Sequence, residues 1–410
     1  MLTLKQTSVK KLFLSVVFIF AFIGCFAQSD GKVTIGNIDS IDSKILHEKR
    51  KIWVHVPSSD PGSIYTKQRY PVVYLLDGDA HFYSVVGMIQ QLSTVNGNTI
   101  CPDMIVVGIP NTDRMRDLTP SNDSSVAPTT GGGEKLMEFM EKELMPYIEA
   151  NYPTQPYKML IGHSLGGLMV MNAVINHTQM FNSYICIDPS MWYDKQKLLK
   201  AGEKIIPKMD FKGISLYLGI ANTMEKGMDV KKVVDDTASI TQHIRSILEM
   251  DKFIRSQNPM GLQYASKYYE NDNHGSVPLI TEYDALHFIF SKYKIDLVMS
   301  DYMDSTVDLV AKYVLHYKEV SKLFGFTMKP PEGDMNGMAY QLLQMKQVKK
   351  AGGIFKMNVE NYPESFNAYD SYGDYFAAIG DKSSAIENFK KALSLKENPE
   401  SRKKLNKLLE

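Results

Sequence analysis

Residues 158–167 read K-M-L-I-G-H-S-L-G-G, with the pattern G-x-S-x-G running from Gly162 to Gly166. A short apolar run at 159–161 precedes the pattern, and an apolar run with helical character follows at 168–174. A strand, a tight turn and a helix in this order hold a serine hydroxyl on a strained turn at the carboxyl edge of a sheet. Small flanking residues are needed because the strand and the helix nearly collide there. The sequence therefore predicts that Ser164 is a nucleophile.

Continuous apolar runs elsewhere in the chain predict strands that are buried on both faces, as in a parallel sheet. Such runs occupy residues 70–76, 104–109, 184–187, 214–220 and 263–269, and residues 51–56 alternate like a further strand. Apolar residues at helical spacing predict helices over 134–151, 230–258, 280–293 and 301–324, the first of them kinked at Pro146. Strands alternating with helices predict an α/β fold with a mostly parallel central sheet flanked by helices.

The first residues have the character of a secretory signal peptide. Lys10 and Lys11 precede an apolar run at 12–22, and Cys25-Phe26-Ala27 offers small residues at a cleavage site. We expect a signal peptide over 1–27, hence export to the periplasm or the medium without a membrane span. Lipoprotein anchoring through Cys25 is the less favoured reading, because the residues before it match a lipobox poorly.

Charge and cysteine content exclude several classes of protein. Removal of residues 1–27 lowers the 46 basic residues to 43, against 46 acidic ones. A balance so close to neutral gives no indication of nucleic-acid or anionic-membrane binding. The two cysteines that remain, Cys101 and Cys186, are too few for a disulfide framework in a chain of this length.

A K-P-P-E-G stretch at 329–333 predicts a linker, so we expect one domain over 28–328 and a second over 329–410. In the second, Ala351 and Phe355 recur 34 residues later as Ala385 and Phe389. This period is typical of tetratricopeptide repeats, which are pairs of packed helices. The predicted second domain is therefore a small all-α unit that ends in a capping helix at 399–410.

A serine hydroxyl needs an adjacent base, and in an elbow-type fold the chain order is serine, acid, histidine. Among the five histidines after Ser164, His274 lies in the polar turn N-D-N-H-G-S directly behind the last predicted strand. We therefore predict His274 as the base. His243 lies within the predicted helix 230–258 and is expected to be exposed, and His163 is expected to pack locally.

The third member of a catalytic triad is less sharply defined. An acid is expected after the predicted strand 214–220, where Glu225 is the first carboxylate and Asp229 the second. Asp188, after the preceding strand, is a third candidate, and a Ser–His dyad is physically possible. Glu225 is the preferred choice.

An oxyanion needs two backbone N–H donors. One is expected from Leu165, which follows the nucleophile, and the other from Asp79, after the predicted strand 70–76 and the flexible Gly78. The Asp79 side chain is not needed for this role, and it would oppose an oxyanion unless it is hydrogen-bonded or turned away.

Five blocks of sequence together resemble the esterase D-type family of putative esterases, which includes the ferric enterobactin esterases. They are L-L-D-G-D at 75–79, N-T-D-R-M-R-D-L-T-P at 111–120, G-H-S-L-G-G at 162–167, D-P-S-M-W at 188–192 and N-H-G-S-V-P at 273–278. The resemblance covers about residues 42–290. It implies an α/β-hydrolase fold, Ser164 as nucleophile, His274 as base, and oxyanion donors at Asp79 and Leu165. Fusion to helical repeats resembles exported proteins of the Bacteroidetes type.

These features predict an exported serine esterase that acts through an acyl-enzyme on a small-molecule ester, either a siderophore ester or a carbohydrate ester. Arg114, Arg116, Trp192 and Tyr193 are the candidate substrate contacts, and no cofactor or metal is expected. An acyltransferase of the same fold and an inert scaffold that binds a protein partner through its repeats are the alternatives.

Overall fold

The computed structural model describes residues 32–57 and 63–410. The predicted signal peptide at 1–27, with Cys25, lies outside the described residues, so its assignment stays a prediction. Among the described helices, none has the length and apolar character needed to span a bilayer. Residues Gly36–Glu410 form one compact unit.

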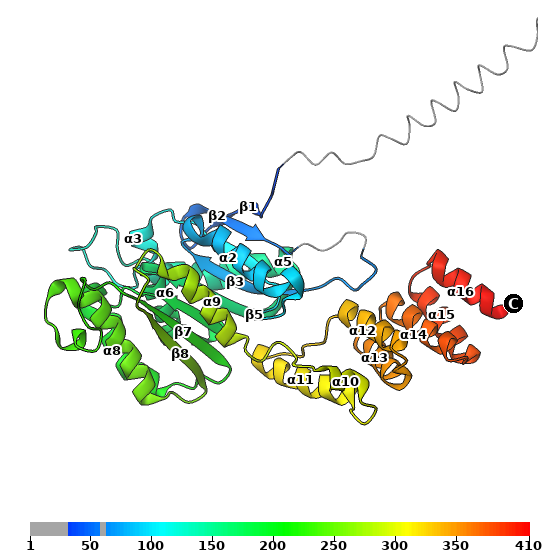
Figure 1. Ribbon diagram of the computed structural model, residues 1–410. Helices are drawn as coiled ribbons and strands as arrows, with labels where there is room; N and C mark the ends of the chain where they lie inside the picture. The colour runs from blue at the N-terminus through cyan, green and yellow to red at the C-terminus, as the bar shows by residue number, and fades with distance from the viewer. Residues whose placement is uncertain (1–31, 58–62) are drawn as a thin grey trace, which may run out of the picture. The chain divides into compact units, whose positions relative to one another are not determined.

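One eight-stranded sheet carries the fold, with the strand order β1-β2-β4-β3-β5-β6-β7-β8 (Figure 1). The pairs β1–β2 and β2–β4 are antiparallel, and every other neighbouring pair is parallel. This confirms the predicted mostly parallel sheet. The strands are β1 (Asn37–Ser43), β2 (Glu48–His55), β3 (Tyr70–Leu76), β4 (Ile105–Ile109), β5 (Thr154–His163), β6 (Ser183–Ile187), β7 (Ile214–Ala221) and β8 (Leu262–Tyr269).

Helices connect the strands and continue beyond the sheet. In the sheet-containing part they are α2 (Gly78–Ser93), α3 (Arg114–Asp117), α4 (Gly133–Phe139), α5 (Met145–Asn151), α6 (Leu165–Asn176), α7 (Tyr193–Ile205), α8 (Gln242–Gln257) and α9 (Val277–Ile289). Those that follow are α10 (Met299–Met303), α11 (Leu309–Phe324), α12 (Glu332–Gln344), α13 (Val348–Asn361), α14 (Phe366–Ala378), α15 (Lys382–Leu395) and α16 (Pro399–Leu409).

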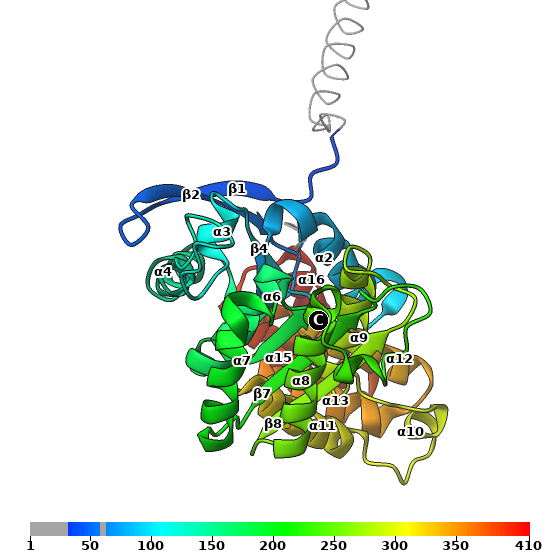
Figure 2. The same ribbon diagram turned by 90° about the vertical axis from the view of Figure 1, so that its left-hand side faces the viewer.

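Helices cover both faces of the sheet, as the continuous apolar strands require. Because successive side chains of a strand point to opposite faces, Val72 and Tyr74 of β3 join the cluster that contains Leu168 of α6 and Ile244 of α8. The alternate residue Val73 is equally buried on the opposite face. There α2 and α9 pack against each other and against β4 and β7 (Figure 2).

Three local features differ from the sequence-based expectations or add to them. The predicted helix over 230–258 begins only at Gln242, because short 3₁₀ turns occupy the residues before it. The helix expected over 134–151 has an irregular π-helical segment, Met140–Leu144, which joins α4 to α5 just before Pro146. The polar stretch 37–43, which has no strand pattern, forms the edge strand β1 because β2 offers it a full set of backbone partners.

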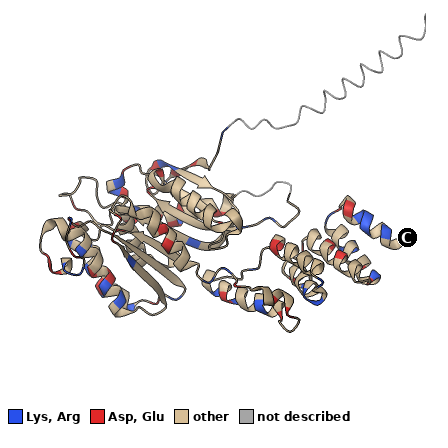
Figure 3. Cartoon of the chain, in the orientation of Figure 1, with Lys and Arg blue, Asp and Glu red and all other residues tan. Residues whose placement is uncertain are grey.

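The carboxyl-terminal helices α12–α16 pack each on the next, which fits a repeat-like all-α arrangement. The 34-residue offset places Ala351 and Phe355 in α13 and their counterparts in α15, all of them buried. Small residues permit close approach, because a Cβ at Gly373 would lie 2.7 Å from the Phe389 ring. Figure 3 marks several Lys and Arg positions along α16. The tetratricopeptide class and the boundary at 328/329 stay predictions.

The crossing of β5 and α6 gives a stability prediction. A Cβ at Gly162 would lie 2.4 Å from the carbonyl oxygen of Gly166, which no rotamer change relieves. We expect Gly162→Ala to lower the free energy of unfolding by about 2 kcal/mol or more, the usual cost of overpacking. Urea denaturation followed by circular dichroism measures it.

Gly87→Ala is the matched control. Gly87 lies in the interior of α2, is exposed, and has open space where a Cβ would stand. This change should raise stability by about 0.5–1 kcal/mol through helix propensity. Equal stability of the Gly162→Ala variant and the unmodified chain would contradict the crossing as described.

Candidate active site

The candidate site lies at the carboxyl edge of the sheet, where β5, β6 and β8 end. Ser164 follows β5, Asp188 follows β6, and His274 lies in the turn after β8. Parallel strands bring their carboxyl ends to one edge, so residues distant in the chain meet there. Ser164 and Asp188 both have positive φ values, 61° and 39°, in a region that non-glycine residues rarely adopt.

Ser164 is held on a sharp turn. Its φ of 61° and ψ of −114° confirm the strained conformation expected from the motif. The Ser164 N–H donates to the carbonyl of Ile187 (3.0 Å), and the Ser164 carbonyl accepts from the N–H of Ser190 (3.0 Å). Bonds to the neighbouring β6 edge therefore fix the backbone on both sides of the hydroxyl and hold the strain.

His274 contacts both other groups of a triad. Its Nε2 lies 3.1 Å from Ser164 Oγ, within reach of the hydroxyl proton. Its Nδ1 lies 2.5 Å from Asp188 Oδ2. Because an ionised carboxylate only accepts, Nδ1 carries the proton and donates to Asp188, which leaves Nε2 as the acceptor for Ser164.

Asp188 is a fully buried carboxylate with three donors. Oδ1 accepts from the N–H of Ala221 (2.9 Å), and Oδ2 accepts from His274 and from His243 Nε2 (2.9 Å). Burial by itself would raise the pKa of Asp188, but the hydrogen bonds from His243 and His274 outweigh burial and hold that pKa well below its usual range. Asp188 is therefore ionised, as the partner of His274 must be.

Glu225, the preferred acid from sequence, is not in this arrangement, and Asp188 stands in its place. Glu225 and Asp229 are both exposed on the segment after β7, whereas Asp188 is in contact with His274. The reason is strand order: β6 pairs directly with β5, so its end lies beside the elbow. The end of β7 contributes the amide of Ala221 instead of an acid.

His243 is the residue that sequence reasoning placed wrongly. It was expected to be exposed, but its side chain is 19% exposed and donates to Asp188. It lies in the first turn of α8, and helical periodicity gives no sign of what that turn faces. Asp188, in contrast, could be found from the sequence, because it follows directly on the apolar run 184–187. It was the third candidate for the triad acid, after Glu225 and Asp229.

The two predicted oxyanion donors come from equivalent positions on neighbouring strands. β3 and β5 pair in register, with Tyr74 opposite Leu160 and Leu75 opposite Ile161, an offset of 86 residues. Asp79 and Leu165, which follow these two strands, are separated by the same number of residues. Both belong to the first turn of a helix, α2 and α6, where backbone amides have no partner within the helix. Their role as oxyanion donors is a proposal below.

The turn before α2 is braced by ion pairing. Arg114 holds Asp77 through two bonds, Nε to Oδ1 (2.7 Å) and an Nη to Oδ2 (2.9 Å). Asp79 Oδ1 accepts from the N–H and the side-chain amide of Asn111, both at 3.3 Å. The Asp79 carboxylate is thus hydrogen-bonded, which meets the condition that sequence reasoning set for it.

The other predicted substrate contacts differ in their surroundings. Arg116 pairs with Glu48 and Asp117, so its charge is already neutralised within the protein. Tyr193 is 2% exposed and donates to the carbonyl of Ser121, a position that argues against contact with a substrate. Trp192 is half-buried and stays a candidate.

The imidazole rings of His274, His163 and His81 lie next to one another. The ring centroid of His163 lies 4.5 Å from that of His274, and His81 lies 5.7 Å beyond His163. Burial, together with the neighbouring histidines, lowers the pKa of His163 to about 4. Near pH 7, His163 is therefore neutral, and its ring packs against that of His274.

The first prediction for the site separates Asp188 from Glu225. Asp188→Asn should lower kcat of an ester substrate by about 10²–10⁴-fold, because an amide at this position favours the wrong tautomer of His274. Glu225→Gln should leave kcat within about twofold of the unmodified enzyme. Thermal unfolding of both variants shows whether a loss of kcat reflects loss of fold. A larger effect at Glu225 than at Asp188 would refute the assignment.

The second prediction for the site concerns pH and stability. Because His163 has a folded-state pKa of about 4 against about 6.5 when unfolded, the unfolded chain binds more protons as pH falls from 6.5 to 4. The free energy of unfolding should therefore fall over that range by at most about 3 kcal/mol on account of His163. Urea titrations at several pH values should show a shallower fall in His163→Phe.

His177→Gln tests the sign of this effect. Pairing with Glu134 raises the pKa of His177, so its stabilisation is present at low pH and is lost as pH rises. In His177→Gln the free energy of unfolding should therefore fall more steeply as pH is lowered. In His163→Phe it should fall less steeply. The same change of slope in both variants would count against the burial argument.

Comparisons with known proteins find similarity to esterases. Residues 43–210 match the model of the family described as "Putative esterase". The ferri-bacillibactin esterase BesA of Bacillus subtilis is 29% identical over 169 residues, 37% of this chain and 58% of that protein. The chain spans about half the length of the curated relatives it matches.

Two solved structures extend the likeness beyond the matched segment. An IroE-like serine hydrolase from Shewanella oneidensis is 29% identical with a TM-score of 0.67, covering 79% of this chain and 99% of that one. An uncharacterised protein from Capnocytophaga ochracea, 19% identical with a TM-score of 0.59, covers 91% of this chain and 99% of its own and shows the fold alone. In its sheet and over residues 43–210, the chain is thus similar to the putative esterases, and its fold is that of an α/β-hydrolase.

Proposed function

We propose that this protein is an exported serine esterase that hydrolyses a carboxylic ester through an acyl-enzyme intermediate. The observation that carries the proposal is the continuous contact from Ser164 Oγ to His274 Nε2 (3.1 Å) and from His274 Nδ1 to Asp188 (2.5 Å). These are the positions of a nucleophile, a base and the group that orients the base. The esterases among its relatives support the same chemistry.

In this mechanism Ser164 Oγ attacks the acyl carbon while its proton passes to His274 Nε2. The oxyanion that forms is bound by the N–H groups of Leu165 and Asp79. Collapse breaks the ester C–O bond, and the imidazolium returns its proton to the leaving alkoxide. Water then attacks the acyl-enzyme with the same base, which releases the acid and restores Ser164. Asp188 stays ionised and balances the charge on His274.

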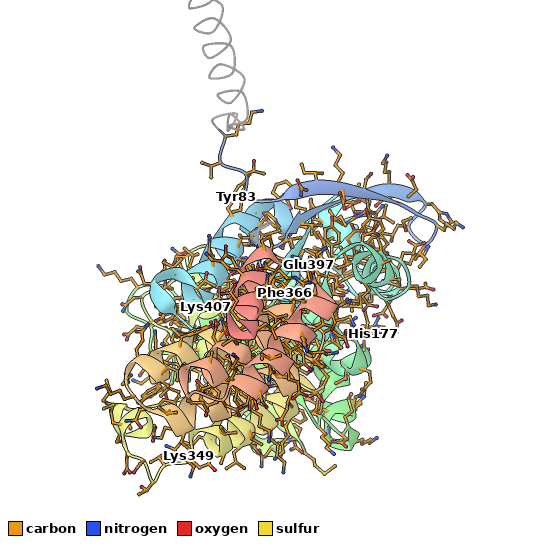
Figure 4. The ribbon with its side chains drawn as sticks, turned by 90° about the vertical axis from the view of Figure 1, so that its right-hand side faces the viewer. Tyr83, His177, Lys349, Phe366, Glu397 and Lys407 are labelled. Atoms are coloured by element: carbon orange, nitrogen blue, oxygen red, sulfur yellow. The ribbon has the colours of Figure 1, made fainter. Side chains whose placement is uncertain are left out.

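We propose a siderophore ester as the substrate class. BesA is named as an esterase of a ferric siderophore, and the matched residues include the elbow and the Asp188 edge. Arg114 is 37% exposed while it holds Asp77, and the half-buried Trp192 adds an aromatic surface near Ser190. These groups suit an anionic aromatic ligand. Tyr83 of α2, the helix that follows β3, is a further exposed aromatic residue; its side chain is labelled in Figure 4 and is 64% exposed.

The roles outside the site are proposals of the same kind. The amino-terminal pattern at 1–27 supports export to the periplasm or the medium. The helices α12–α16 support a protein partner, since stacked helical repeats commonly bind proteins.

Covalent labelling tests the proposed nucleophile. A fluorophosphonate probe should modify the full chain at Ser164, and Ser164→Ala should lose both labelling and turnover of p-nitrophenyl butyrate and of a ferric siderophore trilactone. The loss should reach at least about 10³-fold, since the hydroxyl supplies the covalent step. Mass spectrometry of the labelled peptide locates the modification.

Ser190→Ala is the control, because the Ser190 hydroxyl lies 3.4 Å from Ser164 Oγ. This variant should still be labelled at Ser164. Turnover retained by Ser164→Ala would overturn the serine mechanism. Hydrolysis of acetylated or feruloylated sugars faster than of the trilactone would overturn the substrate class and leave the mechanism intact.

A further inference from the structure

We propose that Asp188, His243 and His274 form a binding site for a divalent transition-metal ion, Zn²⁺ in particular, and that the bound ion inhibits the enzyme. The three ligand atoms are Asp188 Oδ2, His243 Nε2 and His274 Nδ1, and all lie within 4.8 Å of one another. Catalysis needs a single imidazole on the carboxylate, so the second imidazole is a feature that the proposed ester hydrolysis leaves unexplained.

The donor set suits zinc. One carboxylate and two imidazoles are ligands that Zn²⁺ prefers, and three protein ligands with a water in the fourth position make a common zinc site. Tetrahedral bonds of about 2.0–2.1 Å separate the ligand atoms by roughly 3.3 Å. The present N···O distances are 2.9 Å from His243 and 2.5 Å from His274. The imidazoles therefore need to move apart from Asp188 by less than about 1 Å for the ion to enter.

Each ligand is fixed by its own element. Asp188 is anchored through Oδ1 to the amide of Ala221, the kind of outer contact that orients a metal-binding carboxylate. His243 lies on the first turn of the sixteen-residue helix α8. The turn that carries His274 is closed by Asn273 Oδ1, which accepts from the N–H groups of Gly275 and Ser276. Such a set is positioned before the ion arrives.

Solvent reaches the imidazole side of the site. The His274 side chain is 41% exposed and that of His243 is 19% exposed, while Asp188 is completely covered. An ion can thus enter from the solvent side, where the imidazoles are exposed, and reach the buried carboxylate behind them.

The inhibition follows from the tautomers. In the metal-free state Nδ1–H of His274 donates to Asp188 and Nε2 accepts from Ser164. A metal on Nδ1 displaces that proton, and the neutral ring then carries its proton on Nε2. Nε2–H cannot accept the Ser164 proton, so the base is lost. In His243 the proton moves from Nε2 to Nδ1 in the same way, and no net proton is released.

Metal binding stands apart from the proposed function, whereas inhibition rests on it. Binding is therefore measured first, in the full chain carrying Ser164→Ala and stripped with EDTA, by calorimetric titration with ZnCl₂ near pH 7.5. We expect one ion per chain with micromolar affinity. Co²⁺ in place of Zn²⁺ should give the intense visible absorption of a tetrahedral site.

His243→Gln is the decisive variant, because its amide still donates to Asp188 but offers no imidazole. In the Ser164→Ala background it should weaken Zn²⁺ binding by at least about tenfold. His177→Gln is the matched control: it removes a histidine that pairs with Glu134 and is labelled in Figure 4, and it should leave the affinity unchanged.

With Ser164 intact, micromolar ZnCl₂ should inhibit ester turnover and EDTA should restore it. The concentration for half-inhibition should rise at least about tenfold in His243→Gln, with each variant compared with its own metal-free rate. Absence of binding below 100 μM, or equal binding by His243→Gln and the unmodified chain, would overturn the site. Binding without any esterase activity would overturn the proposed function and leave the site standing.

Discussion

The close crossing of β5 and α6 at Ser164 is the contact on which the rest of the site depends. The backbones of Gly162 and Gly166 approach so closely that a Cβ at Gly162 would lie 2.4 Å from the Gly166 carbonyl. At this crossing Ser164 has a positive φ. The strain, of order 1–3 kcal/mol, is held by backbone bonds to Ile187 and Ser190 on the next strand. The same elements thus hold both Ser164 and the segment that carries Asp188.

A buried negative charge is the second organising feature. Asp188 has no exposed surface, and a carboxylate in such a place is stable only when several donors surround it. The amide of Ala221 and the imidazoles of His243 and His274 supply them from three different elements. These hydrogen bonds to Asp188 join β7, α8 and the turn after β8 to the end of β6. It also explains how a helical residue such as His243 comes to lie beside the base.

Sequence reasoning was strongest where the chemistry is local. The elbow, its serine and the apolar strands each follow from residues close together in the chain, and the structure shows them where they were expected. The position of His274 also followed, because a histidine in a turn behind the last strand can reach over the sheet edge. Sequence reasoning failed where the answer depends on which strand lies next to which. The apolar runs give no strand order, and an acid after 214–220 was preferred to one after 184–187.

Local patterns in the chain predicted the fold class, the elbow position of Ser164 and the turn that carries His274, because periodicity and a short motif set backbone conformation and burial over a few residues. Only the tertiary structure decided that Asp188 is the partner of His274, that His243 shares that carboxylate, and that Tyr193 is buried. The physical reason is that hydrogen bonds such as these join atoms 55 and 86 residues apart. Which donors meet at a buried charge is set by strand order and helix packing, and no local pattern in the chain encodes that meeting.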